Sequence, residues 1–373
     1  MALDLYVNSS TETAGDFGGG NDANPGTAKA SPAQTIAHAI EENITETVDE
    51  EIVIHLARTM EDVYENVVAQ EYDTGSERLD LASLNFTQGG SLTIECYDLP
   101  SDFDLFNPAM EGETVTETAW TFLLPTIPSV KVTYGGSVKL KGVHIRGGNE
   151  ELFESGPSTG INALWGASLN LTSCRIYGAT YGVFILESYA MINNCLFDHC
   201  RVGVLGTNSS TFLLASRSII SNATEMGFCV ASNSVAAIFT LPNSDGTTNS
   251  NSTVLEIRTT EPRKSYTAVK AMAAGQVILD GDLPGLDPSI RIPGFIRILR
   301  QSEYDSSEYR GVVLESMGMM MGTSNVFFRN AGSELSESST VYDNSDDDTD
   351  LTDTVSEERQ FIVATEQGAV AIE

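Results

Sequence analysis

The sequence has little positive charge, no long apolar run and an odd number of cysteines. Its 373 residues include 52 Asp and Glu against 20 Lys and Arg, for a formal net charge of -32. Such a chain repels nucleic acid phosphates and anionic membranes, so we expect neither as a direct partner. No segment reaches 18 uninterrupted apolar residues, and the N-terminus lacks a basic and apolar signal pattern. We therefore expect no membrane span and no signal peptide.

The cysteines and histidines give no metal or disulfide pattern. Five cysteines in a chain of this length argue against a disulfide framework, so we expect buried, reduced thiols. The four histidines are scattered and show no zinc-ligand spacing. The sequence also lacks a phosphate-cradling glycine loop, a nucleophile elbow and a Cys-x-x-Cys pair. The sequence therefore predicts no cofactor.

A repeat of just over twenty residues runs through the middle of the chain. Gly160, Gly182, Gly203 and Gly227 recur at intervals of 22, 21 and 24 residues. This spacing is typical of one coil of a solenoid, in which stacked coils about 4.8 Å apart bury one another's apolar side chains. It predicts a parallel β-helix with three or more stacked coils between about Gly135 and Leu241.

Aligning the coils on these glycines predicts which side chains stack in the core. Two expected columns and one stacked cysteine pair follow: Leu171, Ile192 and Leu214; Ile176, Phe197 and Ile219; and Cys174 with Cys195. An earlier coil, 138–145, joins these columns through Leu140 and Ile145.

One helix is expected near the N-terminus. Ser31 can cap it, Pro32 suits its first position, and Gln34 completes a capping box. We place this helix at about 32–43. A strand, 52–56, should follow it.

This N-terminal region resembles the entry of right-handed parallel β-helix proteins of the pectate-lyase-like superfamily. The resemblance rests on Tyr6-Val7-Asn8, on the Asn, Asp and Gly-rich loop 21–27, and on the helix that follows. It covers roughly the first 70 residues and implies a short helix that covers one open end of the solenoid. Lyases, bacterial surface proteins and phage spikes share this entry, so it specifies the fold more than the function.

We predict an all-β fold with three regions. Residues 1–50 form the entry loop and capping helix, 51–275 form the parallel β-helix, and 276–373 form a separate β-rich region. Strands are expected there near 276–279, 295–299, 311–314, 326–328 and 361–372. We interpret this region as a cap for association, with antiparallel pairing considered, because a bare last coil would expose a strand edge.

The polar clusters offer only weak catalytic and metal sites. Asp198 and Arg201 could serve a lyase as a calcium carboxylate and a base, but no acidic residue is expected one coil away. A turn with local salt bridges is the simpler interpretation. Asp346, Asp348, Asp350 and Glu357 fit part of a calcium-loop template, although Leu351 replaces its glycine. Calcium is therefore the one ion considered, against a solvated acidic loop.

Two functions follow from these features. The first is a virion surface protein of a tailed phage, a homotrimeric head-decoration protein or spike that contacts capsid or tail proteins and acts without catalysis. The alternative is a polysaccharide depolymerase, a lyase or glycosidase, acting on a host surface glycan. Trp165 and Tyr181 are the residues expected to stack on sugars. The sequence leaves the enzyme question open and favours the first function.

Overall fold

The computed structural model describes most of the solenoid wall and part of its loops. The described residues are 2–13, 16–44, 47–57, 60–61, 67–68, 71–73, 79–81, 84–87, 89–97, 120–123, 130–146, 159–215, 218–240, 255–259, 266–279, 292–293, 296–300, 309–321, 326–330, 362–364 and 369–371. Internal contacts divide the chain into two parts. The first part holds Met1–Val183 and Asn194–Leu196, and the second holds Phe184–Asn193 and Phe197–Glu373.

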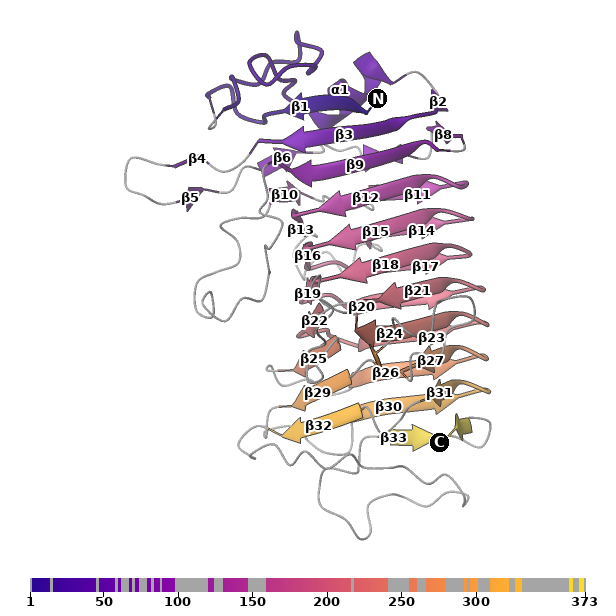
Figure 1. Cartoon of the computed structure of the whole chain (residues 1–373). Helices are drawn as coiled ribbons and strands as arrows, with labels where there is room; N and C mark the ends of the chain where they lie inside the picture. The colour runs from indigo at the N-terminus through magenta and orange to yellow at the C-terminus, as the bar shows by residue number, and fades with distance from the viewer. Residues whose placement is uncertain are drawn as a thin grey trace. The chain divides into compact units, whose positions relative to one another are not determined.

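The first part winds through three parallel sheets (Figure 1). One sheet contains β1 (Leu3–Val7), β3 (Glu51–Leu56), β9 (Ser91–Cys96), β12 (Ser137–Lys141) and β15 (Ser168–Thr172). The second contains β6 (Glu71–Asp73), β10 (Trp120–Leu123), β13 (Val143–Arg146) and β16 (Arg175–Tyr177). The third contains β7 (Leu79–Asp80), β11 (Val130–Thr133) and β14 (Thr159–Leu164), and the next strand of the chain is β17 (Tyr181–Leu186). Two short pairs, β2 (Thr47–Val48) with β8 (Asn85–Phe86) and β4 (Met60–Glu61) with β5 (Val67–Val68), complete it.

The second part repeats the same three-sheet winding. Its first sheet contains β18 (Tyr189–Asn193), β21 (Thr211–Leu214), β24 (Val235–Thr240), β27 (Gln276–Ile278), β31 (Met319–Met321) and β34 (Ala369–Ala371). Its second contains β19 (Leu196–Asp198), β22 (Ser218–Ser221), β25 (Leu255–Thr259), β29 (Ile296–Arg300) and β32 (Val326–Asn330). Its third contains β20 (Val202–Thr207), β23 (Met226–Ala231), β26 (Tyr266–Met272), β30 (Tyr309–Glu315) and β33 (Ile362–Ala364). β28 (Ile292–Pro293) pairs antiparallel with β24.

The C-terminal strands continue the solenoid. β29 pairs in parallel with β25, β30 with β26, and β31 with β27. The antiparallel pairing considered for 276–373 is therefore wrong for these strands. The glycine spacing is irregular in this region because the segments between the strands differ in length. The division into 1–50, 51–275 and 276–373, and an association role for the last region, stay predictions.

The core consists of side chains stacked from coil to coil. In the first part Leu140 pairs with Leu171 and Ile145 with Ile176, and in the second part Ile192 pairs with Leu214. The five cysteines are buried and form no disulfide, and the amide of Leu196 donates to the carbonyl of Cys174 at 2.9 Å. That bond sets Cys195 beside Cys174, as the coil alignment predicts.

One predicted column member is displaced by a residue. The amide of His199 donates to the carbonyl of Ser221, which places Asp198 beside Ser221 and Phe197 beside Ile220 rather than Ile219. A Cβ added to Gly203 would lie 2.8 Å from Ile220 Cγ2, so Ile220 fills the core opposite this glycine. Both isoleucines are buried, and the sequence pattern therefore did not separate them.

The N-terminal helix starts later than predicted. α1 spans Ile36–Asn43, and Thr35 is its N-cap, accepting from the amide of His38. Residues near Pro32 are extended because Ala33 pairs with the edge of β1, donating to Tyr6 and accepting from Asn8. Ser31 and Pro32 therefore protect an edge strand rather than open a helix. Within the described residues, no helix has the length and apolar character needed to span a bilayer.

The turns that lead into β21, β24, β27 and β31 accept only small inner residues. These positions hold Ser210, Ser234, Gly275 and Gly318. The amide of Ser210 donates to Ser234 Oγ at 3.1 Å, and Ser210 Oγ donates to Thr207 O at 2.6 Å. A Cβ on Gly275 would lie 2.2 Å from the carbonyl oxygen of Val230. These turns therefore hold successive coils at one spacing.

A charge in the core should abolish folding. Ile192 is 0% exposed and stacks on Leu214. Ile192→Asp buries an unpaired carboxylate, at a cost of about 4 kcal/mol or more, and we expect insoluble protein. Thr211→Asp, on the outer side of β21, is the matched control and should stay soluble. Expression and thermal unfolding of both variants measure this, and a soluble, heat-resistant Ile192→Asp would contradict the stacking.

Candidate functional site

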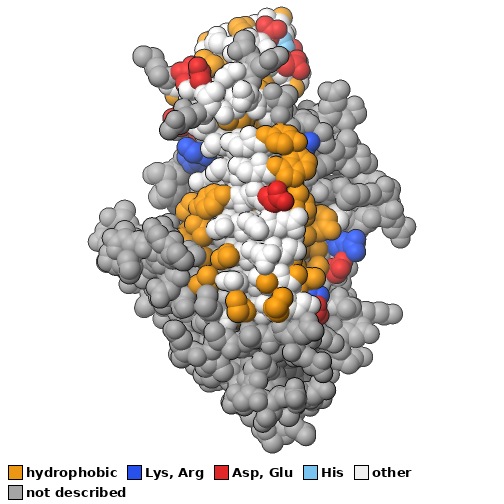
Figure 2. Space-filling model, turned by 90° about the vertical axis from the view of Figure 1, so that its right-hand side faces the viewer, with side chains coloured by type: hydrophobic (Ala, Val, Ile, Leu, Met, Phe, Trp, Pro, Cys, Tyr) orange, Lys and Arg blue, Asp and Glu red, His pale blue; other side chains and the backbone are white. Residues whose placement is uncertain are grey.

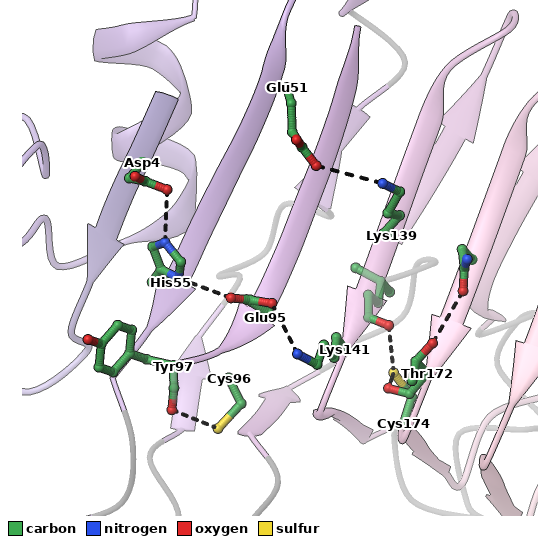
Figure 3. A network of polar contacts seen from close by, with 12 residues as sticks. Asp4, Glu51, His55, Glu95, Cys96, Tyr97, Lys139, Lys141, Thr172 and Cys174 are labelled. Carbon is green, nitrogen blue, oxygen red and sulfur yellow. Dashed lines mark hydrogen bonds and ion pairs between the residues drawn. The ribbon is translucent and has the colours of Figure 1, made fainter. Parts of the chain in front are cut away.

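A polar ladder crosses the outer face of the first part. Successive residues of a strand point to opposite faces, so the neighbours of the buried leucines and isoleucines point outward. The strand registers align Tyr6 with His55, His55 with Glu95, and Glu95 with Lys141. Figure 3 shows Asp4, His55, Glu95 and Lys141 turned toward one another across β1, β3, β9 and β12.

His55 lies between two carboxylates in this ladder. Its Nε2 is 3.1 Å from Asp4 Oδ1, and its Nδ1 is 3.2 Å from Glu95 Oε1. The Nδ1 contact is an ion pair without good hydrogen-bond direction. Glu95 Oε2 then lies 3.6 Å from Lys141 Nζ. The His55 side chain is only 14% exposed, so the surroundings hold the imidazole in place.

Aromatic rings complete these surroundings. The ring of Tyr6 stacks on His55 with centroids 5.1 Å apart, and Tyr97 meets His55 edge-on at 5.5 Å. Phe17, from the entry loop, contacts both Tyr6 and Tyr97. Lys29 bonds the hydroxyl of Tyr97, and its Nζ lies 4.1 Å from the centroid of that ring. These rings therefore join the entry loop to β1, to β3 and to the end of β9.

The charges in this ladder shift one another's pKa. Burial lowers the pKa of His55, but its contacts with Glu95 and Asp4 outweigh burial and raise the pKa above 6.5. The contact with His55 is the largest effect on Glu95 and lowers its pKa below 4.5, against the opposing effect of burial. The imidazolium and the carboxylate thus stabilise each other.

The contacts of Asp4, His55 and Glu95 fit a stabilising ion-pair network better than a pair of catalytic carboxylates. Asp4 and Glu95 lie on strands two apart, roughly 10 Å by strand spacing, which is near the separation of the two acids in an inverting glycosidase. His55 fills the space between them and contacts both. A glycosidic bond would have to displace it.

The predicted catalytic residues each have a salt-bridge partner. Asp198 Oδ1 lies 2.8 Å from His199 Nδ1, and Arg201 pairs with Glu225. The neighbour of Asp198 one coil further is Ser221, which is not acidic. The geometry matches a turn with local salt bridges, and a catalytic role for Asp198 and Arg201 stays a prediction.

The predicted calcium ligands cannot be placed. Asp346, Asp348, Asp350 and Glu357 lie outside the described residues. Among the residues that the structure does describe, no group of three or more His, Cys, Asp or Glu side chains could hold a metal ion.

A pair of exposed aromatic rings stands on the turns into β12 and β15. Trp165 is 41% exposed and Tyr134 is 72% exposed. Their rings stack, with centroids 5.2 Å apart and planes inclined by 22°. Trp165 was predicted as a sugar-stacking residue, and its partner proves to be Tyr134. Tyr181, the other predicted stacking residue, is half-buried at the start of β17.

The backbone conformation of these turns does not require aromatic residues. Tyr134 and Trp165 have φ angles of 50° and 54°, in the left-handed region. In the second part, the first residue of the equivalent turns is Asn208, Ser232, Ala273 or Ser316, with φ between 50° and 53°. Small and polar residues therefore satisfy this backbone, and asparagine suits it best. On the face that Figure 2 shows, the coloured side chains are mostly hydrophobic or uncharged.

Sequence analysis did not select Tyr134, although a repeated four-residue pattern includes it. The segment Tyr134-Gly135-Gly136-Ser137 matches Trp165-Gly166-Ala167-Ser168 in type and order, 31 residues later. The register pairs Thr133 with Leu164 and Ser137 with Ser168, which sets the two turns one above the other. An aromatic-Gly-small-Ser pattern was the available clue.

Comparison with known proteins supports the fold. The family described as right handed beta helix region matches residues 127–257. The chain folds as a right-handed parallel β-helix. The fold prediction is thus confirmed, and so is the resemblance to right-handed parallel β-helix proteins.

Among solved structures, the GH136 lacto-N-biosidase from Eubacterium ramulus is similar to this β-helix. The identity is 10%, the TM-score is 0.36, and the match covers 99% of this chain and 68% of that one. No curated protein matches the sequence.

The ladder predicts a pH-dependent contribution to stability. A raised His55 pKa gives stability that is complete below the unfolded value of 6.5 and is lost as pH rises through the folded value. A lowered Glu95 pKa gives stability that is complete above the unfolded value of 4.5 and is lost as pH falls through the folded value. The contributions of His55 and Glu95 are therefore both complete between about pH 4.5 and pH 6.5.

His55→Gln should therefore cost most in mildly acidic solution. We expect a loss of about 1 to 3 kcal/mol at pH 5.5 and a smaller loss at pH 9, measured by chemical unfolding at low salt. His199→Gln, at a partly buried turn where the imidazole contacts Asp198, serves as the comparison. A deficit for His55→Gln that stays constant across this range would show that His55 is not held as an imidazolium.

Proposed function

We propose that this β-helix protein binds a neutral glycan on the stacked rings of Tyr134 and Trp165. The observation that carries the proposal is the exposure of two large aromatic side chains on one ridge, 72% and 41%, where the backbone accepts Asn, Ser or Ala. Exposed aromatic rings that serve no core are typical of binding surfaces.

The net charge of the chain limits which chemical class of glycan can bind. A sugar ring presents C–H groups to an aromatic face while its hydroxyls stay hydrated, so it needs no basic partner. At a net charge of -32, a polyuronate or phosphorylated ligand would be repelled over a long range. A neutral polysaccharide avoids this cost. Its binding should depend little on salt.

This proposal is nearer to the predicted polysaccharide function than to the predicted virion role. It requires binding and leaves cleavage as a further proposal. A reducing-sugar assay on any glycan that binds tests cleavage, with Asp198→Asn as the first variant. A place on a phage particle stays a prediction, and so does trimer formation, which a light-scattering mass tests directly.

Trp165→Ala should weaken glycan binding about fivefold or more. Loss of one stacking ring removes about 1 to 3 kcal/mol of interaction, and Tyr134→Ala should act in the same direction. Isothermal titration against a panel of neutral polysaccharides measures the effect. Thermal unfolding should change little in both variants, because these side chains lie outside the core.

Met317→Ala is the matched control. Met317 is 64% exposed on an equivalent turn of the second part and has no aromatic partner among the described residues. It should bind as the parent does. If the parent binds no neutral glycan, or if Trp165→Ala binds as tightly as the parent, the proposed function is wrong.

A further inference from the structure

Two glycines accompany the aromatic pair at matching positions. Gly135 follows Tyr134 and Gly166 follows Trp165, and the register of β12 with β15 sets one glycine above the other. A third glycine, Gly89, continues this line through the register of β12 with β9. All three are left-handed, with φ of 98° at Gly89, 80° at Gly135 and 81° at Gly166.

Packing does not require these glycines. A Cβ added to Gly89 or Gly135 would have no atom within 4 Å, and one on Gly166 would meet only the Gly135 nitrogen, at 3.8 Å. The glycines of the core differ, since a Cβ on Gly203 would lie 2.6 Å from Gly227 O. The line is therefore open surface.

The backbone favours glycine at these positions, but the turn position itself admits other residues. In the second part, the same turn position holds Ser209, Asn233, Ala274 and Met317, with φ between 60° and 66°. Side chains of four kinds thus occupy this turn position, at a smaller φ than the 80° and 81° of Gly135 and Gly166. Both turns that carry a large aromatic residue omit the next side chain, as does the turn at Gly89, which follows Gln88.

Among the described residues, the backbone amide of Gly135 also lacks a hydrogen-bond acceptor. In the second part, the amide of Ser209 donates to Ser232 O at 2.9 Å, and that of Asn233 donates to Ala273 O at 3.0 Å. The corresponding bond from Gly135 to the carbonyl of Trp165 is not made, and within the described residues this amide has no acceptor. A backbone donor, the Gly135 amide, and the Trp165 carbonyl that it does not reach therefore lie beside the ring pair.

We infer that Gly135 and Gly166 form the floor of the glycan subsite and decide what fits on it. The inference rests on the proposed function and adds to it. A neutral pyranose would lay its C–H face against the aromatic ring, and one edge hydroxyl would meet the bare backbone. A hydroxyl both donates and accepts, so it can satisfy the Gly135 amide and the Trp165 carbonyl together.

Side chains added to the floor should block the ligand without unfolding the protein. Gly135→Asn and Gly166→Asn place on the floor a residue that this turn accepts at Asn233. We expect each variant to bind a neutral glycan at least tenfold more weakly than the parent, by isothermal titration, with a thermal midpoint within a few degrees of the parent. Gly135→Ser and Gly166→Ser repeat the test with the residue found at Ser209.

Asn233→Gly is the matched control, since it makes the opposite change on a turn without an aromatic residue, and it should bind as the parent does. If the floor variants bind as the parent does while Trp165→Ala loses binding, the rings alone make the site. The floor inference is then wrong and the proposed function stands. If the parent binds no neutral glycan, the proposed function fails and the floor fails with it.

Discussion

The structure depends on parallel strands stacking in register, coil upon coil. Each inward side chain packs on a similar one in the next coil, as Leu140 does on Leu171 and Ile192 on Leu214. A core of this kind tolerates no local change of spacing. The turns into β21, β24, β27 and β31 repeat their geometry, and small inner residues such as Ser210 and Gly275 let them do so.

The same constraint leaves the outward positions free to vary. Residues distant in the sequence become neighbours on the outer face, and their chemistry does not affect the core. The first part uses this freedom twice. At its N-terminal end, His55 joins Asp4 to Glu95, and on its turns Tyr134 and Trp165 stack in the open. The first arrangement stabilises the wall, and the second has no structural role that we can identify.

The fold could be predicted because its signals repeat. Four glycines and two apolar columns recur at nearly constant spacing, and the stacking of coils follows from them. Ile219 and Ile220 could not be separated, because both are apolar and both are buried. The start of α1 was misplaced because good capping residues near Ser31 instead pair with the edge of β1.

The sites were harder to predict because they depend on register between coils of unequal length. Asp4, His55 and Glu95 are separated by 51 and 40 residues, with no common period, so their contact is invisible in the sequence. Trp165 could be selected because it follows the boundary of a predicted coil. Its pairing with Tyr134 required knowing that their two turns, 31 residues apart, lie in adjacent coils.

The chain has two tryptophans, Trp120 and Trp165, so the fluorescence of Trp165 can report on binding at the site. In a Trp120→Phe protein, the emission of Trp165 reports on its ring directly. We predict that titration with neutral oligosaccharides gives a saturable change in that emission, unaffected by raising the salt concentration. An emission that stays constant across the panel, up to millimolar sugar, would contradict the claim that this ridge binds glycans.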